Sequence, residues 1–185
     1  MTKILGHHAI GPIIMPSWVR TASGLALSLI SAGLLTLAFP PYNFGLLIWI
    51  GFIPMLVAQY RLLPGRISSL ASGVAIGGWL GVLLVPMFSG KSIFMTAVPL
   101  LAGVLAFLAG KTKRVFHERT GYRWFIAEGV LGWVGLEMIR SFIPAIGTWA
   151  FVGYPLWNQP WLIQPLSVFG IYGLDLLIMF GNYAL

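Results

Sequence analysis

The stretch TASGLALSLISAGLLTLAFPPYNFGLLIWIGFIPMLVAQY, residues 21–60, contains no charged side chain. A bilayer core of about 30 Å is crossed by about 20 apolar residues in a helix that rises about 1.5 Å per residue. Pro40 and Pro41 lack the amide hydrogen that a continuing helix needs, so a helix stops there. The stretch therefore predicts two membrane-spanning helices, over residues 21–39 and 44–60.

The composition also indicates a protein that lies in a membrane. Of the 185 residues 58% are apolar and only 8% are charged, with a mean hydropathy of +0.91. Soluble domains carry charge on about a quarter of their residues, so an ordinary soluble domain is excluded. The 23 glycines follow no three-residue period, which excludes a collagen-like chain. The absence of cysteine excludes disulfides, zinc-thiolate sites and a cysteine nucleophile within this sequence.

Apolar runs farther along the chain predict more spans of the same kind. We expect an all-α, polytopic transmembrane bundle of about six spans behind a short tail, residues 1–20. The four further spans are predicted at residues 67–88, 93–109, 124–140 and 161–185. Within the third span, small residues at helical spacing predict close packing against a neighbouring helix. These are Gly73, Gly77, Gly78 and Gly81.

Alternating spans assign every loop charge to one of two faces. Nine cations fall on one face and two, Lys91 and Arg140, on the other. The nine are Lys3, Arg20, Arg61, Arg66, Lys111, Lys113, Arg114, Arg119 and Arg123. Because cytoplasmic loops are enriched in Lys and Arg, this bias predicts a cytoplasmic N-terminus. The PPYN turn, the turn at residues 89–92 and residues 142–160 then face outward.

Ionisable residues inside spans are the first candidates for function, because each is expensive to insert into lipid. Glu137 and Arg140 are three apart on one predicted helix, and Trp133 lies one turn before Glu137 on the same face. They form a structural ion pair, hold a lipid headgroup or orient the outer loop. Asp175 has no cation in its own span, so it is protonated, paired with Arg140 or beside water. Glu128, near the cytoplasmic end, is expected to be an interfacial anchor.

The predicted outer stretch IPAIGTWAFVGYPLWNQPW, residues 143–161, concentrates aromatic side chains among Gly and Pro. Trp149 and Tyr154 are its leading candidates for contact with lipid. The stretch either joins two helices as an interfacial aromatic belt or clamps an acyl chain or a partner domain.

Motifs of soluble enzymes are missing from the sequence. It has no HExxH, no Gly-rich phosphate loop and no Ser-His-Asp set, so we expect no catalytic residue, metal site or cofactor. His7 and His8 are interpreted as part of a solvated tail. The basic segment KTKRVFHERTGYR, residues 111–123, is predicted to be an inward loop, and nucleic acid is not an expected partner.

Three segments resemble the bacterial apolipoprotein N-acyltransferases. LTLAFPPYNFGLLIWIGFIPML at residues 35–56 is similar to the first turn and second span of that family. WVGLEMIRS at residues 133–141 resembles its W-x-x-x-E-x-x-R helix before an outer aromatic loop. PWLIQPLSVFGIYGLDLLIMFGNYAL at residues 160–185 resembles its following span through Gln164, Gly170, Tyr172 and Gly173. The sequence departs from the family at residues 147–150 and at Asp175.

The resemblance implies a multi-pass protein of the bacterial plasma membrane. Its partners would be phospholipid and a lipoprotein whose N-terminal diacylglyceryl-cysteine receives an acyl chain. In the family, a Glu-Lys-Cys triad in an outward-facing nitrilase-like domain performs the transfer through a thioester. We expect this chain to be the membrane portion alone, with the nitrilase-like domain separate or missing, and to be inactive by itself.

Two alternatives from other functional classes stay open. A small transporter or channel would use Asp175, Glu137 and Arg140 to line a polar path. A non-enzymatic membrane scaffold would dock another protein through the Gly-rich third span.

Overall fold

The computed structural model describes residues 16–88, 93–144, 147–164 and 166–185. This part of the chain is helical and contains no strand. The predicted features at Lys3, His7, His8 and the turn at residues 89–92 lie outside it. The elements are α1 (Ser17–Ala38), η1 (Gly45–Trp49), α2 (Ile53–Val57), η2 (Ala58–Leu62), α3 (Leu70–Phe88), α4 (Ile93–Arg119), α5 (Phe125–Ser141), η3 (Tyr154–Leu156) and α6 (Leu166–Ala184).

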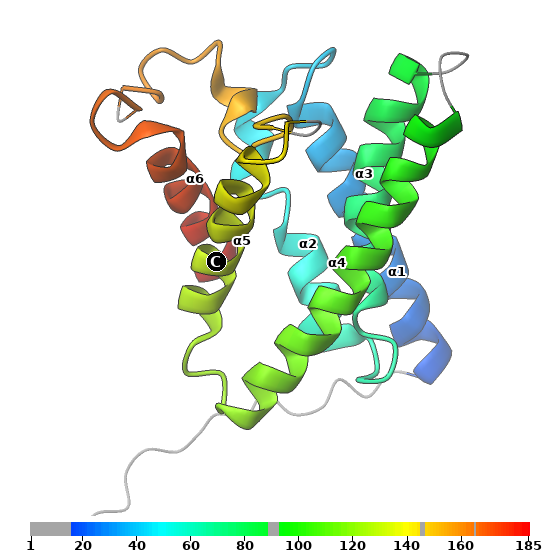
Figure 1. Ribbon diagram of the computed structural model, residues 1–185. Coiled ribbons are helices and arrows are strands. Elements are labelled where there is room, and N and C mark those ends of the chain that lie inside the picture. The colour runs from blue at the N-terminus through cyan, green and yellow to red at the C-terminus, as the bar shows by residue number, and fades with distance from the viewer. Residues whose placement is uncertain (1–15, 89–92, 145–146, 165) are drawn as a thin grey trace, which may run out of the picture.

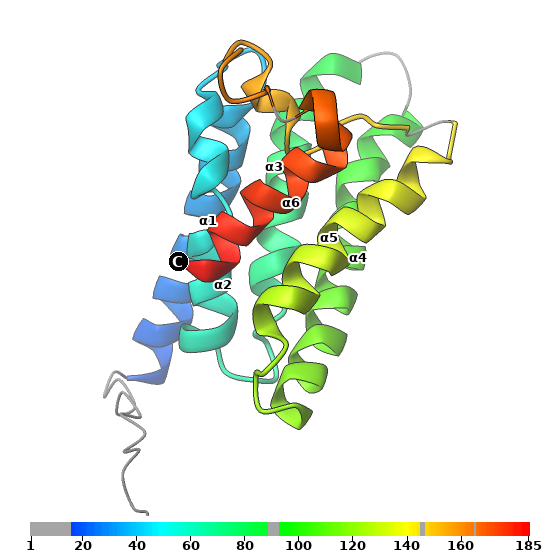
Figure 2. The same cartoon turned by 90° about the vertical axis from the view of Figure 1, so that its left-hand side faces the viewer.

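The long helices form two groups with α2 between them. α3 packs along both α1 and α4, while α5 packs mainly on α6 (Figure 1). The turn after α1 and the segment between α5 and α6 lie at one end of the bundle (Figure 2). The turn between α4 and α5 lies at the opposite end. We call these the aromatic-loop end and the basic end.

Several helices are apolar enough for a membrane. Among the described residues, Ser17–Ala38, Gly45–Leu62 and Leu166–Ala184 have the length and composition of membrane spans, and Leu70–Pro86 is a shorter apolar helix. The all-α fold class is therefore confirmed. α1 begins and ends close to the first predicted span, whereas α6 begins at Leu166, later than the predicted residue 161.

The second predicted span is not one regular helix. Its chain runs through the 3₁₀ turn η1, an irregular step at residues 50–52, the short helix α2 and the π-helical η2. In a bilayer, such backbone is tolerated only where other parts of the protein satisfy its polar groups. Two side chains from neighbouring helices do so.

Asn182 of α6 and Ser31 of α1 bind the backbone at this irregular step. The Asn182 side chain accepts a hydrogen bond from the Phe52 N–H at 2.9 Å and donates to the Ile48 carbonyl at 2.9 Å. Ser31 Oγ donates to the Gly51 carbonyl and accepts from the Met55 N–H at 3.2 Å. Both side chains are buried, so the break is fixed from two sides.

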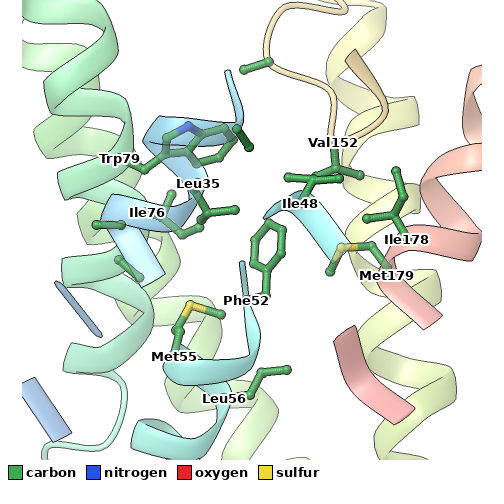
Figure 3. Close-up of a cluster of buried hydrophobic side chains, with 14 of the residues drawn as sticks. Leu35, Ile48, Phe52, Met55, Leu56, Ile76, Trp79, Val152, Ile178 and Met179 are labelled. Carbon is green, nitrogen blue, oxygen red and sulfur yellow. The ribbon is translucent and has the colours of Figure 1, made fainter. Parts of the chain in front are cut away.

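The main core lies around this broken span. Figure 3 shows Ile48 and Phe52 between Leu35 of α1 on one side and Ile178 of α6 on the other. Phe52, Ile48, Leu35 and Ile178 have no exposed surface. Burying a large apolar side chain stabilises by about 1.5–3 kcal/mol in water, but in lipid this contribution is replaced by close packing. The core therefore positions the helices by shape.

Glycines bring α3 and α4 into backbone contact, as their spacing predicts. A Cβ added to Gly73 would lie 3.1 Å from the Gly103 carbonyl oxygen, and one added to Gly77 would lie 3.2 Å from the Gly103 Cα. Any larger residue would separate the two helices. Gly78 serves another contact, since its Cβ would lie 3.2 Å from Ala32 of α1.

The basic segment 111–123 is mostly helical, so its prediction as a loop was wrong. α4 continues without interruption to Arg119, and only the short turn around Gly121 separates it from α5. Lys, Arg and Glu favour helices, and the Arg114–Glu118 pair at 2.7 Å has the i,i+4 spacing that stabilises one. The charged residues of this segment therefore did not mark the end of the helix.

Candidate functional site

The last turn of α5 carries the predicted ion pair. Arg140 Nη2 lies 3.9 Å from Glu137 Oε1, at i,i+3 spacing. Glu137 is 2% exposed, and its Oε1 also accepts a hydrogen bond from the Val152 N–H at 3.1 Å. Arg140 Nη1 donates to the Trp149 carbonyl at 2.5 Å. The pair therefore holds the backbone of the segment between α5 and α6.

Arg140 also holds the segment through an aromatic ring. Its guanidinium carbon lies 5.1 Å from the centre of the Phe151 ring, within the range of a cation–π interaction. Phe151 is fully buried and also packs against Tyr172 of α6, with ring centres 5.7 Å apart. Tyr172 in turn shares a hydrogen bond with Ser141 at 3.1 Å. The segment is thus attached to both α5 and α6.

Asp175 of α6 lies beneath this segment. It is fully buried, and a Cβ added to Gly153 would come within 2.7 Å of Asp175 Oδ1. The Glu137 carboxyl and the Arg140 guanidinium are its charged neighbours, and neither Asp175 oxygen completes a hydrogen bond. Its partner on another helix is therefore the Glu137 carboxyl, with Arg140 farther away.

Trp133 lies one turn before Glu137, as the sequence predicts. Its indole N–H approaches the Glu137 carboxyl but completes no hydrogen bond. The ring packs edge-on against Phe52, with centres 4.8 Å apart. Trp133 therefore connects the buried carboxyl to the broken second span.

The segment at residues 147–164, which we call the aromatic loop, is a set of tight turns and not an extended strand. Ala150 has φ 59°, a left-handed conformation that is uncommon for a residue with a side chain. This turn is held from both sides by the Arg140–Trp149 and Glu137–Val152 bonds. Tyr154 donates its hydroxyl hydrogen to Thr148 Oγ1 at 2.6 Å and is 39% exposed.

The far half of the aromatic loop is tied to the turn after α1. Trp157 Nε1 donates to Asn43 Oδ1 at 3.2 Å. A Cβ on Gly45 would lie 2.1 Å from the Pro155 carbonyl oxygen, so a side chain there would prevent this approach. The PPYN turn and the aromatic loop therefore form one surface. Trp157 and Trp161 remain more than 60% exposed on it.

The basic end has a separate polar cluster around Glu128. Its carboxylate lies 3.1 Å from Lys113 Nζ and 3.2 Å from His117 Nε2. His117 is fully buried among aromatic rings and stacks on Tyr122 at 5.8 Å. Burial lowers the pKa of His117 below 6.5, against the opposing effect of the Glu128 carboxylate. Glu128 therefore joins α4 to α5.

All six predicted candidates at the aromatic-loop end come together in space. Trp133, Glu137 and Arg140 come from α5, Trp149 and Tyr154 from the loop, and Asp175 from α6. Within the described ranges, no three His, Asp or Glu side chains converge in a way that would hold a metal ion. The arrangement can position a loop and present aromatic surface.

Comparison with known proteins identifies the family. The model of the apolipoprotein N-acyltransferase N-terminal domain matches residues 31–184. The chain belongs to the apolipoprotein N-acyltransferase family. It is 31% identical over 168 residues to the apolipoprotein N-acyltransferase of Geobacter metallireducens, a match that covers 86% of this chain and 32% of that protein. The Rickettsia prowazekii enzyme of the same name is 38% identical over 79 residues, which cover 42% of this chain and 16% of the relative. No solved structure matches the chain.

The chain thus spans about a third of the length of the Geobacter acyltransferase that it matches. The three segments that resemble the acyltransferase family adjoin one another in the structure. The turn of the first segment meets the aromatic loop through Asn43 and Trp157, and that loop lies on the Glu137–Arg140 helix. Gly170 of the third segment breaks α6 with φ 64° and ψ −176°, a conformation essentially limited to glycine.

Sequence analysis missed several residues that determine this arrangement. Ser31 and Asn182 carried no motif, although a polar amide inside an apolar span was a usable signal. His117 was treated only as part of a basic segment. Its burial depends on Tyr60 and Phe125, which come from distant parts of the sequence.

Proposed function

We propose that this chain is the membrane-embedded part of a bacterial apolipoprotein N-acyltransferase in the plasma membrane. In this role it presents phospholipid and a diacylated lipoprotein at the aromatic-loop end. A nitrilase-like domain with a Glu-Lys-Cys triad would perform the acyl transfer. The observation that carries the proposal is the aromatic loop, held by Glu137 and Arg140 with Trp149, Tyr154 and Trp157 exposed.

The physical reasoning concerns the location of amphipathic aromatic side chains. Trp and Tyr favour the level of the lipid headgroups, because their rings are apolar while their N–H and O–H groups bind water. A rigid loop of such residues at one end of an apolar bundle is suited to hold a lipid near its ester bonds. Glu137 and Arg140 hold the loop through its backbone, so the exposed aromatic side chains are left for a ligand.

Competitive photolabelling tests this role. The full chain is reconstituted in vesicles with a phospholipid that carries a photoreactive acyl chain, and labelled peptides are mapped by mass spectrometry. We expect a diacylated lipopeptide to reduce labelling of residues 147–164 and to leave labelling of the basic end unchanged. A belt that only touches bulk lipid would be labelled equally with and without the lipopeptide, and that result would overturn the proposal.

A matched pair of variants separates the two ends. Tyr154 and Tyr122 are 39% and 41% exposed, one at each end. We expect Tyr154→Ala to weaken competition by the lipopeptide and Tyr122→Ala to leave it intact. Equal effects would contradict a site at the aromatic loop.

The absence of cysteine gives a chemical test. A thioester needs a thiol, and this sequence contains none. We expect the purified chain alone to transfer no acyl group from phospholipid to a diacylated lipopeptide, as measured by the mass of the lipopeptide. Turnover by this chain would refute the division of labour.

We also propose six crossings with the basic end in the cytoplasm. The support is the charge bias, together with the position of Arg114, which donates to the Gln59 carbonyl at 2.8 Å and so groups the two basic connectors. An alkaline phosphatase fusion near Trp157 should be active, and one in the turn at Gly121 inactive. The reverse pattern would contradict the orientation.

Transport is the second candidate function, because Glu137 and Asp175 are buried ionisable residues within apolar helices. It predicts proton- or solute-coupled flux into vesicles that Asp175→Asn abolishes. The acyltransferase proposal predicts no such flux.

A further inference from the structure

Two buried carboxyl groups face each other under the aromatic loop. Glu137 is 2% exposed and Asp175 is not exposed at all. Their side chains interact closely, yet Glu137 Oε2 and both Asp175 oxygens complete no hydrogen bond, although the Trp133 indole N–H approaches Glu137 and the Gly153 backbone approaches Asp175. A buried polar atom without a partner is costly, so three such atoms in one place require an explanation.

Repulsion between the two carboxylates determines how many protons this cluster binds. Two carboxylates in contact and away from water cannot both be ionised without a large penalty, and one proton between them removes it. That proton also pairs two of the three atoms, one Asp175 oxygen as the donor and Glu137 Oε2 as the acceptor. With one proton, Arg140 contributes +1, the carboxyl pair −1, and the cluster is neutral. With none, the cluster would carry one uncompensated negative charge.

The surroundings indicate which carboxyl is ionised. Glu137 Oε1 accepts from the Val152 N–H at 3.1 Å and lies 3.9 Å from Arg140 Nη2. Both contacts stabilise a negative charge on Glu137. Asp175 lies farther from the cation and fits as the acid whose O–H points to Glu137.

We propose that Glu137 and Asp175 form a proton-binding site, in which neutral Asp175 donates a hydrogen bond to the Glu137 carboxylate and so holds the aromatic loop against α6. The loop depends on this proton because the Gly153 backbone lies directly on Asp175, within 2.7 Å of a Cβ built there. The other titratable groups nearby are Arg140 of α5, which acts on both carboxyls, and Tyr154 of the loop, which acts on Arg140; Tyr172 of α6 packs against Phe151.

Loss of the proton would place a second negative charge under the loop backbone. The neutral cluster would then need water or a cation, and neither can enter while Gly153 covers Asp175. We therefore expect the loop to lift when the pair is fully ionised. The site does not depend on the acyl chemistry proposed above.

Infrared spectroscopy of the full chain in lipid tests the site directly. The sequence has only four acidic side chains, so a protonated one can be assigned. Glu118 pairs with Arg114 and Glu128 with Lys113, so each of these carboxylates has a cationic partner. We expect one carboxylic-acid carbonyl band per chain at neutral pH, shifted by deuterium exchange. A folded chain without this band would overturn the proposal.

Two variants assign the band, and a third is the matched control. Asp175→Asn should remove the band while its amide still donates to Glu137. Glu137→Gln should also remove it, because Asp175 then faces an amide donor. Glu128→Gln, at the other end of α5, should leave it unchanged. A band that persists in both folded pair variants would refute the assignment, and the wild-type spectrum decides the case if neither variant folds.

Limited proteolysis tests the hold on the loop. We expect the aromatic loop of Asp175→Asn to resist cleavage as the wild type does, because the hydrogen bond is kept. Asp175→Ala should increase cleavage within residues 147–164 at least several-fold. Equal cleavage of the Asn and Ala variants would show that the hydrogen bond does not hold the loop.

Discussion

Replacement of Asn182 by leucine removes the side chain that satisfies the broken second span from α6. Leucine has a similar size and no polar atom, so packing is largely kept. Two backbone groups lose their partners, the Phe52 N–H and the Ile48 carbonyl, and both residues are fully buried. The bond to the Ile178 carbonyl is not counted, because a helix satisfies that group through its own backbone.

The expected loss follows from these two groups. An unpaired buried backbone group costs about 1–3 kcal/mol in water-soluble proteins. Interhelical hydrogen bonds in membrane proteins average about 0.6 kcal/mol and reach about 1.7 kcal/mol, because the unfolded chain in lipid also finds partners. Taking about 1 kcal/mol for each group, we expect a loss of about 2 kcal/mol, or about 30-fold in the folded-to-unfolded ratio.

Unfolding in mixed micelles by increasing SDS, followed by tryptophan fluorescence, measures this loss. Gln59→Leu is the matched control. Gln59 is 3% exposed but makes one long hydrogen bond, 3.4 Å to the Gly110 carbonyl, which belongs to a helix. We expect it to cost less than about 1 kcal/mol. Equal losses for the two variants would refute the reasoning that Asn182 satisfies the break.

Three further changes test other parts of the structure. Gly170→Ala should lower stability by about 1–3 kcal/mol in SDS unfolding, because alanine is strained at φ 64° and ψ −176°. Arg140→Ala should cost about 1.5–3 kcal/mol in the same assay, since it removes the bond to the Trp149 carbonyl and the cation beside Glu137. The chain should lose stability as pH falls below 6.5, because burial lowers the pKa of His117 and only the unfolded state then takes up the proton. His117→Phe should reduce this loss, measured as the change in SDS midpoint between neutral and acidic pH.

The glycine and arginine changes each have a matched control variant. Gly135→Ala places a methyl group in open space within α5, so it should be neutral or stabilise by up to about 1 kcal/mol. Arg119→Ala removes an exposed cation and should change stability by less than about 0.5 kcal/mol. Losses equal to those of Gly170→Ala and Arg140→Ala would contradict the two assignments. An unchanged pH dependence in His117→Phe would exclude His117 as its source.

Sequence periodicity and charge predicted the parts of the fold that depend on local composition. Apolar runs located α1 and α3 closely. Glycine spacing predicted that Gly73 and Gly77 pack closely against a neighbouring helix, which the structure identifies as α4. The grouping of Trp133, Glu137 and Arg140 followed from helical spacing. These features depend on residues that lie within about two helical turns of one another, so the local sequence is enough to predict them.

The remaining features depend on distant parts of the chain. The break in the second span is determined by Ser31 and Asn182, which lie 20 and 130 residues from their respective backbone partners. Nothing within residues 44–60 reveals those partners. Asp175 meets Glu137 only because α5 and α6 pack together. The prediction of a loop at residues 111–123 was wrong because Lys and Arg are enriched near a membrane surface, and a helix can continue beyond that surface.

The dependence of the second span on Asn182 has a consequence for biogenesis. When residues 48–52 leave the ribosome, the amide that will bind them is still 130 positions from being translated. In hydrocarbon their free peptide groups would be poorly solvated. We expect this segment to remain near the translocon or the headgroups until α6 is inserted, so that the second span is completed only when α6 arrives.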